Sequence, residues 1–396
     1  TEDRLVEIAA KAKECGVELF VLDDGWFGAR SNDYAGLGDW VANRERLPQG
    51  IKGIADRIEE MGMKFGLWFE PEMVNKDSDL YRAHPDWILQ TPQRHSCHGR
   101  NQYVLDFSRK EVVDCIYEMM YKILSEAKVS YIKWDMNRSI TECCSAALPA
   151  DRQGEVFHRY ILGVYDLYER LNTAFPQILF ESCASGGGRF DPGILYYAPQ
   201  GWTSDDTDAA ERVKIQYGTS MCYPVSSMGS HVSVVPNHQL NRKTPLHTRA
   251  NVAYFGTFGY ELDLNKLSDE EISEVKQQIT FMKEYRELIQ FGTFYRLKSP
   301  FEGNETVWMT VSEDKKTALV FWYRERNVVN ADFTRVRLQG LDPDLIYRNE
   351  YNETENYGDE LMNLGLLTTD CTAGEPTSED EPCTDYESRI YVLTAK

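Results

Sequence analysis

The chain has 396 residues, and its 63 acidic residues outnumber its 43 basic residues to give a formal net charge of −20. This charge disfavours nucleic acids and anionic membrane surfaces as partners. A mean hydropathy of −0.50, without any apolar run of membrane-spanning length, indicates a soluble protein that is large enough for more than one domain.

The nine cysteines follow no zinc-site spacing, and no signal peptide is evident, so we expect reduced thiols and a cytoplasmic location. Cys371 and Cys383 flank an acidic loop and are a candidate disulfide pair. The sequence begins without Met on a helix-like segment at 1–15, with Gly16 as its stop signal. This beginning suggests a piece of a longer protein.

Up to about residue 292, short apolar runs that end in polar or acidic residues alternate with amphipathic segments of helix length. This rhythm is typical of parallel α/β architecture. Strands are expected at about 17–22, 65–69, 129–134, 178–180, 201–203, 225–232 and 255–264. Helices are expected at about 1–15, 51–61, 109–126, 155–173, 209–221 and 268–291.

Acids at successive strand ends favour a (β/α)8 barrel of the TIM type, whose active site lies at the carboxyl ends of its strands. One strand of the eight, which would precede Thr1, is missing. A doubly wound open sheet competes with this fold, but no glycine-rich nucleotide loop follows the first strand. We predict a catalytic barrel domain at 1–292. With seven strands in its barrel, the chain 1–396 expressed alone should be aggregation-prone and at best feebly active.

After residue 292 the pattern changes to short strands separated by polar turns. Strands are expected at 307–311, 318–323, 336–338 and 390–393, which predicts a small antiparallel domain at 293–396. The acidic, turn-rich stretch 350–386 is expected to be a loop or an insertion.

The stretch 131–138 combines strand formers with a lysine and an aspartate. Lys133 and Asp135 are two residues apart on a strand and should point to the same side. Lys133 can then lie near the Asp135 carboxylate, keep it ionised and hold a polar group of a substrate. Such a carboxylate can act as nucleophile, base or metal ligand. Alternatively, Lys133 and Asp135 form only a structural salt bridge at the surface after the strand.

Acids follow five successive strands and would converge on one barrel mouth, with tryptophans at 26, 68, 134 and 202 among them. Carboxylates and aromatic rings suit a sugar site, where one carboxyl attacks the anomeric carbon and another protonates the leaving oxygen. Carboxylates near Asp205 would keep such an acid protonated. Helix capping is the structural alternative for Asp206 and Asp208. The acids are Asp23, Asp24, Glu70, Glu72, Asp135, Glu181, Asp205, Asp206 and Asp208.

The residues alone leave two other classes open. A metal-dependent barrel enzyme would bind Mg²⁺ through Asp23, Glu70 and Asp135, although tryptophans adjoin most of the acids and no phosphate-binding loop is evident. EDTA would inactivate such an enzyme and spare a glycosidase. A non-catalytic carbohydrate-binding or scaffold protein is the third class, and tight sugar binding without turnover would favour it.

Five long segments resemble bacterial α-galactosidases of glycoside hydrolase family 36, and the match runs in order along essentially the whole chain. The segments are 20–28, 66–74, 133–138, 183–189 and 202–208. The resemblance implies a retaining enzyme with a (β/α)8 catalytic domain between a large N-terminal β-sandwich and a small C-terminal β-sandwich. It also implies melibiose- or raffinose-type galactosides as substrates, no metal or cofactor, and a homo-oligomeric full-length form.

Carried over by position, the resemblance implies that Asp135 is the nucleophile and Asp205 the acid/base. Asp23 and Asp24 would bind the galactose O4 and O6 hydroxyls. Cys183 is expected to be a pocket wall, because no histidine partner marks it as an activated thiolate. The residues implied to bind the sugar are Asp23, Asp24, Trp68, Arg100, Lys133, Asn137, Cys183 and Gly186.

Overall fold

The computed structural model describes residues 1–328, 333–368 and 385–396, so the candidate pair Cys371 and Cys383 lies outside the described residues. The chain divides into two compact units, Thr1–Trp202 and Thr203–Lys396. The domain boundary at 292 stays a prediction, and it falls between a helix and a strand of the second unit. Within the described residues, no helix combines the length and the apolar character needed to cross a membrane.

The first unit is built around parallel strands in the order β1, β2, β5, β6, β7. Phe69 at the end of β2 lies opposite Trp134 at the end of β5, and Trp134 lies opposite Ser182 of β6. Because the strands run the same way, the residues that follow them gather at one edge of the sheet. The strands are β1 (Leu19–Leu22), β2 (Lys64–Phe69), β5 (Tyr131–Trp134), β6 (Leu179–Ser182) and β7 (Gln200–Trp202).

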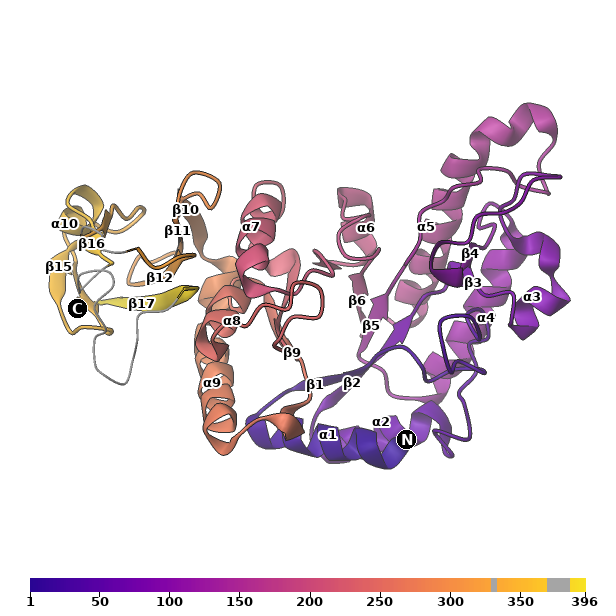
Figure 1. Ribbon diagram of the computed structural model, residues 1–396, viewed down its shortest axis with the longest axis horizontal. Coiled ribbons are helices and arrows are strands. Elements are labelled where there is room, and N and C mark those ends of the chain that lie inside the picture. The colour runs from indigo at the N-terminus through magenta and orange to yellow at the C-terminus, as the bar shows by residue number, and fades with distance from the viewer. Residues whose placement is uncertain (329–332, 369–384) are drawn as a thin grey trace. The chain divides into compact units, whose positions relative to one another are not determined.

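Helices connect these strands, and α1 ends where the sequence predicts. Gly16 has a φ of 98°, the left-handed conformation that caps helices and that glycine adopts without strain. Helices α1 and α2 lie side by side along β1 and β2 (Figure 1), and α4 packs against α5. The helices are α1 (Glu2–Cys15), α2 (Gly50–Glu60), α3 (Asp79–Ala83), α4 (Lys110–Glu126), α5 (Val156–Ala174) and α6 (Pro192–Tyr197).

The core of the first unit explains why its strands read as unbroken apolar runs. Five of the six residues of β2 are buried, because helices cover one face and the site lies on the other. A two-stranded antiparallel ribbon, β3 (Met73–Val74) with β4 (Tyr103–Val104), extends the loop after β2. This ribbon and the short helices α3 and α6 were not predicted.

The second unit holds two further parallel strands, β8 (Met228–Ser233) and β9 (Thr257–Glu261). The structure thus contains the seven predicted parallel strands within its described residues, whereas closure into a barrel stays a prediction. Ser268 and Glu271 form a capping box that starts the last long helix. The helices are α7 (Ala209–Ser220), α8 (Leu246–Ala253) and α9 (Asp269–Phe291).

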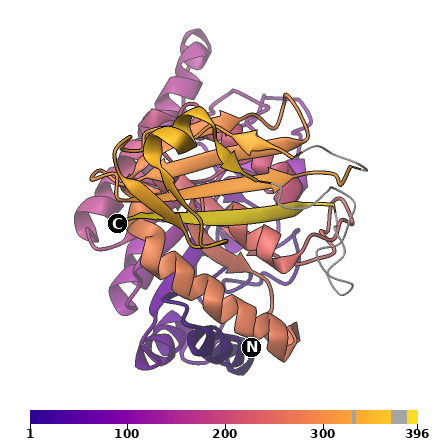
Figure 2. The same ribbon diagram turned by 90° about the vertical axis from the view of Figure 1, so that its left-hand side faces the viewer.

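The C-terminal part of the second unit is an antiparallel sheet in the order β10, β11, β12, β17, β14, β15. Figure 2 shows β11, β12 and β17 side by side. The sandwich arrangement stays a prediction. The strands are β10 (Thr293–Lys298), β11 (Glu305–Val311), β12 (Thr317–Arg324), β13 (Arg335–Val336), β14 (Ile346–Asn349), β15 (Glu355–Tyr357), β16 (Leu366–Leu367) and β17 (Glu387–Ala395).

The prediction of a loop over 350–386 is wrong for its described part. This part contains β15, the helix α10 (Gly358–Asn363) and β16, which pairs with β13. Leu361 and Leu366 are buried in the core of the sheet domain, whereas the acidic residues around them face outward. Burial of Leu361 and Leu366 therefore stabilises secondary structure in a segment whose composition is typical of a loop.

Candidate active site

Asp135 stands directly after β5 and is 7% exposed. Its backbone N–H donates to the Phe69 carbonyl at 2.8 Å, so the neighbouring strand β2 fixes its position. Its Oδ2 accepts hydrogen bonds from Trp68 Nε1 at 3.2 Å and from Asn137 Nδ2 at 2.6 Å. Its Oδ1 accepts from the Met136 backbone N–H at 2.8 Å. Three donors thus hold this carboxylate in one orientation.

Lys133 lies on the same side of the sheet as Asp135, but its hydrogen bond goes elsewhere. Its Nζ donates to Asp23 Oδ2 at 3.0 Å, and the negative charge of Asp135 also acts on it, in agreement with the expectation that Lys133 lies near Asp135. Burial alone would lower the pKa of Lys133, but the negative charges of Asp23 first, and then of Glu181 and Asp135, raise it. A permanently charged ammonium therefore joins the ends of β1 and β5.

Asp24 is engaged by an arginine that no sequence motif indicated. Arg30 Nη2 lies 2.7 Å from Asp24 Oδ2, and Arg30 Nε lies 2.9 Å from Oδ1. Arg30 is 5% exposed and also donates to the Ala35 carbonyl. Asp23 and Asp24 are thus two exposed carboxylates in the loop after β1. Asp23 pairs with Lys133, and Asp24 pairs with Arg30.

Asn137 connects Asp135 to two loops. Its side-chain oxygen accepts from Arg100 Nη1 at 2.6 Å and from Ser185 Oγ at 3.2 Å, while its Nδ2 donates to Asp135. The predicted residues Arg100 and Asn137 are therefore brought together with Asp135. Ser185, which was not singled out, joins them.

Cys183 lies at the end of β6 and is 2% exposed. Burial first, and then the charge of Asp135, raise the pKa of its thiol well above the usual range. Its sulfur accepts the Gly186 N–H at 3.4 Å, in a turn where Gly186 has a φ of 86°. A thiol so resistant to ionisation suits a pocket wall and not a nucleophile.

Of the four tryptophans that lie among the acids in the sequence, Trp26 and Trp134 pack against other aromatic rings. Trp134 precedes Asp135 on β5, so its side chain points to the opposite face, where it stacks on Tyr168 at 3.9 Å between ring centroids. Trp26 packs against Phe69 and donates to the Trp68 carbonyl at 2.9 Å. Trp68 contacts Asp135, and Lys133 Nζ lies 6.0 Å from the Trp202 ring centroid.

Glu72 does not join the other acids, although the sequence predicts convergence. It is fully buried and forms two hydrogen bonds with Arg189, at 2.7 and 2.8 Å. Trp134 Nε1 and the Tyr160 hydroxyl also donate to it. Burial by itself would raise the pKa of Glu72, but the Arg189 guanidinium and these donors hold it below the usual value. Glu72 is thus the centre of a structural ion pair.

Glu70, two residues before Glu72, is fully buried beside Asp135. Its Oε1 accepts the Asn137 backbone N–H, and its Oε2 lies 3.1 Å from Gln102 Nε2. Burial first, and then the charge of Asp135, raise the pKa of Glu70 to about 8.

In the described residues, no group of three or more His, Cys, Asp or Glu side chains is arranged to hold a metal ion. Asp23, Glu70 and Asp135 therefore do not form the magnesium site considered from the sequence.

The second unit contains the acidic cluster that follows β7. Asp208 caps α7 by accepting the N–H groups of Ala210 and Glu211 at 3.0 and 3.2 Å, and it also binds Arg242. Asp206 Oδ1 accepts the Asp208 N–H at 3.0 Å. The helix-capping alternative is confirmed for Asp208, whereas the role of Asp206 stays a prediction. Asp205 is the exposed member of the cluster.

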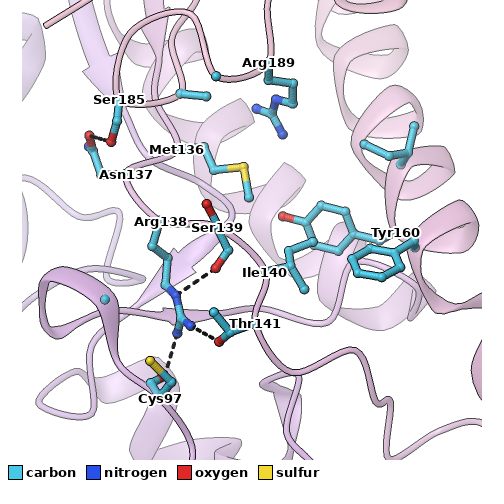
Figure 3. Close-up of a pocket in the computed structure, with 15 residues that line it drawn as sticks. Cys97, Met136, Asn137, Arg138, Ser139, Ile140, Thr141, Tyr160, Ser185 and Arg189 are labelled. Carbon is cyan, nitrogen blue, oxygen red and sulfur yellow. Dashed lines mark hydrogen bonds between the residues drawn. The ribbon is translucent and has the colours of Figure 1, made fainter.

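A cavity of about 600 Å³ lies beside Asn137, between the segment that follows Asp135 and α5. Arg138 forms part of its wall (Figure 3) and donates to the carbonyls of Cys97 at 2.8 Å and Gln102 at 3.0 Å. Its guanidinium also donates to Thr141 Oγ1. These contacts clamp the chain immediately after the Asp135–Asn137 pair.

The parallel strands with carboxylates at their ends, followed by an antiparallel sheet, define an α/β protein of the glycoside hydrolase class. The Melibiase family model matches residues 1–292, and the model of the glycosyl hydrolase family 36 C-terminal domain matches residues 305–393. The chain therefore belongs to glycoside hydrolase family 36, as the resemblance predicts.

Several alpha-galactosidases are similar to this chain over most of its length. Alpha-galactosidase AgaA of Geobacillus stearothermophilus is 55% identical over 365 residues, which are 92% of this chain and 50% of the relative. Alpha-galactosidase Mel36A of Lactobacillus acidophilus is 53% identical over 365 residues, again 92% of this chain and 50% of the relative. The crystal structure of AgaA matches with a TM-score of 0.95 at 52% identity, covering 100% of this chain and 54% of that chain. The chain thus spans about half the length of the curated relatives it matches.

Proposed function

We propose that this protein releases terminal α-linked galactose from α-galactosides of the melibiose and raffinose type. The observation that carries the proposal is the Asp135 carboxylate, held by Trp68, Asn137 and a backbone N–H beside the Lys133–Asp23 pair. Membership of family 36 supports it, as do the relatives named alpha-galactosidases. Variants of AgaA have been crystallised with raffinose and with stachyose, which supports oligosaccharides as the substrate class.

The reaction we propose is a double displacement with retention. Asp135 attacks the anomeric carbon and forms an ester while the bond to the leaving oxygen breaks, and Asp205 gives that oxygen its proton. Asp205 then takes a proton from water, which attacks the anomeric carbon and releases Asp135 as a carboxylate. The product keeps the α configuration. This chemistry requires the two carboxyl groups to lie roughly 5–5.5 Å apart in the active enzyme.

The sugar-binding roles that we propose are those that the family resemblance implies, and contacts of the first unit support them. Asp23 and Asp24 would accept hydrogen bonds from the O4 and O6 hydroxyls, with Lys133 and Arg30 holding the carboxylates in place. Arg100 and Asn137 would bind further hydroxyls beside Asp135. Trp68, Cys183 and Gly186 would close the pocket, with the last two near O2.

Turnover of 4-nitrophenyl α-galactoside by the full-length protein tests the activity, with the α-glucoside and the α-N-acetylgalactosaminide as controls. Equal rates on all three would contradict galactose specificity. Proton NMR should detect α-galactose as the first product, and β-galactose would refute retention. A slow galactosyl substrate should label Asp135, and mapping the adduct to another residue would reassign the nucleophile.

The role of Asp205 has its own test. Asp205→Ala should slow substrates with poor leaving groups by about 10²–10⁴-fold and activated aryl galactosides far less, because only the former need a proton from the enzyme. Asp206→Ala is the matched control and should show no such dependence on the leaving group. The reverse pattern would move the acid/base role to Asp206.

A further inference from the structure

Glu70 and Asp135 occupy equivalent places at the ends of two neighbouring strands. Each follows the last residue of its strand, and those last residues, Phe69 and Trp134, lie opposite each other in the register of β2 and β5. Glu70 is fully buried, and the charged groups that act on it are Asp135 and Arg100. The Arg100 guanidinium donates to the Asn137 side chain, and no ion pair neutralises Glu70 among the described residues.

The amide that contacts Glu70 has one polar atom without a partner. Gln102 Nε2 lies 3.1 Å from Glu70 Oε2, which leaves Gln102 Oε1 buried without a partner. A buried acceptor without a donor is costly, and the oxygen and nitrogen of an amide exchange places by a half turn. With the amide turned, Gln102 presents its oxygen to Glu70. In that arrangement the contact needs a proton on Glu70, which a neutral carboxylic acid supplies.

We propose that Glu70 is a positioning residue that remains a neutral carboxylic acid at neutral pH, donates its O–H to Gln102 and accepts the Asn137 N–H. It thereby holds the Asn137 amide against Asp135 and leaves Asp135 as the single negative charge of the pair. The consequence for catalysis rests on the proposed nucleophilic role of Asp135. Two ionised carboxylates this close would repel each other, and the raised pKa of Glu70, about 8, is consistent with one shared charge.

Infrared spectroscopy of protein labelled with ¹³C-glutamate tests the protonation without any turnover. The label shifts the band of a protonated glutamic acid, which should be present at pH 6 and disappear with a midpoint of about 8. Glu70→Gln should abolish the band, and Glu72→Gln, which changes the neighbouring ion-paired glutamate, should keep it. Absence of the band at pH 6 in the wild type overturns the proposal even if a variant fails to fold. Its persistence in Glu70→Gln overturns it as well.

Kinetics of the full-length enzyme test the positioning role. Glu70→Ala should lower kcat by about 10²-fold, because the Asn137 loop loses its anchor beside the reacting carboxylate. Glu70→Gln, which can accept from Asn137 and donate to Gln102, should recover most of that loss and remove the alkaline limb near pH 8 from the profile of kcat/KM. Equal losses in the two variants, or an unchanged pH profile in Glu70→Gln, contradict positioning by a neutral acid. An inactive wild type would contradict only the proposed function, because the infrared result would stand.

Discussion

Glu70 and Glu72 stand two residues apart in one loop, both fully buried, and their surroundings differ completely. Around Glu72, an arginine, an indole and a phenol satisfy the charge, and the pKa of the carboxyl falls. Around Glu70, another acid stands close by, its hydrogen-bond partners are amides, and the pKa rises to about 8. The residue type is the same, so the neighbours decide whether a buried carboxyl is an ion or an acid.

The difference separates an ion pair that stabilises the fold from the region in which we propose the chemistry. The Glu72–Arg189 region ties the loop after β2 to the loop after β6 with compensated charges. The Asp135–Glu70 region collects acids in a buried place and so stores electrostatic free energy where a reaction can use it. Four predictions challenge this division, in order of decreasing effect.

Asp135→Ala should reduce turnover of α-galactosides by about 10⁴-fold or more, because no other carboxylate holds the same place after β5. Steady-state kinetics of the full-length enzyme measures this loss. Glu72→Gln is the control from the other region and should change stability far more than kcat. If the activity of Asp135→Ala stayed within tenfold of the wild type, the proposed catalytic role of the Asp135 region would be contradicted.

The Glu70 region should make the protein less stable as the pH rises. The pKa of Glu70 rises from 4.5 in the unfolded chain to about 8 in the fold, so folding takes up a proton between these values. Its stabilising contribution is complete below pH 4.5 and is lost as the pH passes through 8, a change of up to about 5 kcal/mol. Urea unfolding at pH 5 and pH 9 should show this loss in the wild type and not in Glu70→Gln. Parallel pH profiles for the two proteins would contradict the assignment.

The Glu72 region should show the opposite pH dependence. Because the fold lowers the pKa of Glu72, its contribution to stability is present above the unfolded pKa of 4.5 and is lost as the pH falls through the folded value. Glu72→Gln leaves Arg189 buried without its counter-charge and should cost about 3–5 kcal/mol at pH 7. Asp56→Asn, which breaks the exposed pair with Lys52, should cost less than about 1 kcal/mol. Similar losses of unfolding free energy in the two variants would show that the buried Glu72–Arg189 pair stabilises the fold no more than an exposed pair does.

Cys183→Ser should have the smallest effect, an increase of about tenfold or less in KM with retention preserved. The thiol is buried next to Asp135 and neutral, so a hydroxyl of similar shape keeps the wall of the pocket. Cys115→Ser on α4 is the control and should leave KM unchanged. Loss of all chemistry in Cys183→Ser would mean that the Asp135 region contains a second reactive group.

The long periodic segments of this chain could be predicted because local pattern and tertiary environment agree. Helix α1 with Gly16 and the strand before Asp135 are examples. The direction of Trp134 follows from the alternation that puts Lys133 and Asp135 on one side, but its partner Tyr168 lies on α5, and no spacing rule connects the two rings. The Glu70–Gln102 contact joins residues 32 positions apart, and no spacing rule connects them. Arg30 reaches Asp24 through a loop turn that has no sequence signature.

The indole of Trp68 ends on the carboxylate of Asp135, and that of Trp26 ends on a backbone carbonyl. The proton on the Trp68 nitrogen therefore senses whether Asp135 carries a charge, while the proton on the Trp26 nitrogen does not. With eight tryptophans in the chain, the two signals can be assigned by single substitutions and followed together. The site thus contains a probe and an internal reference, and the difference between their chemical shifts would report the charge of Asp135 during the reaction that we propose.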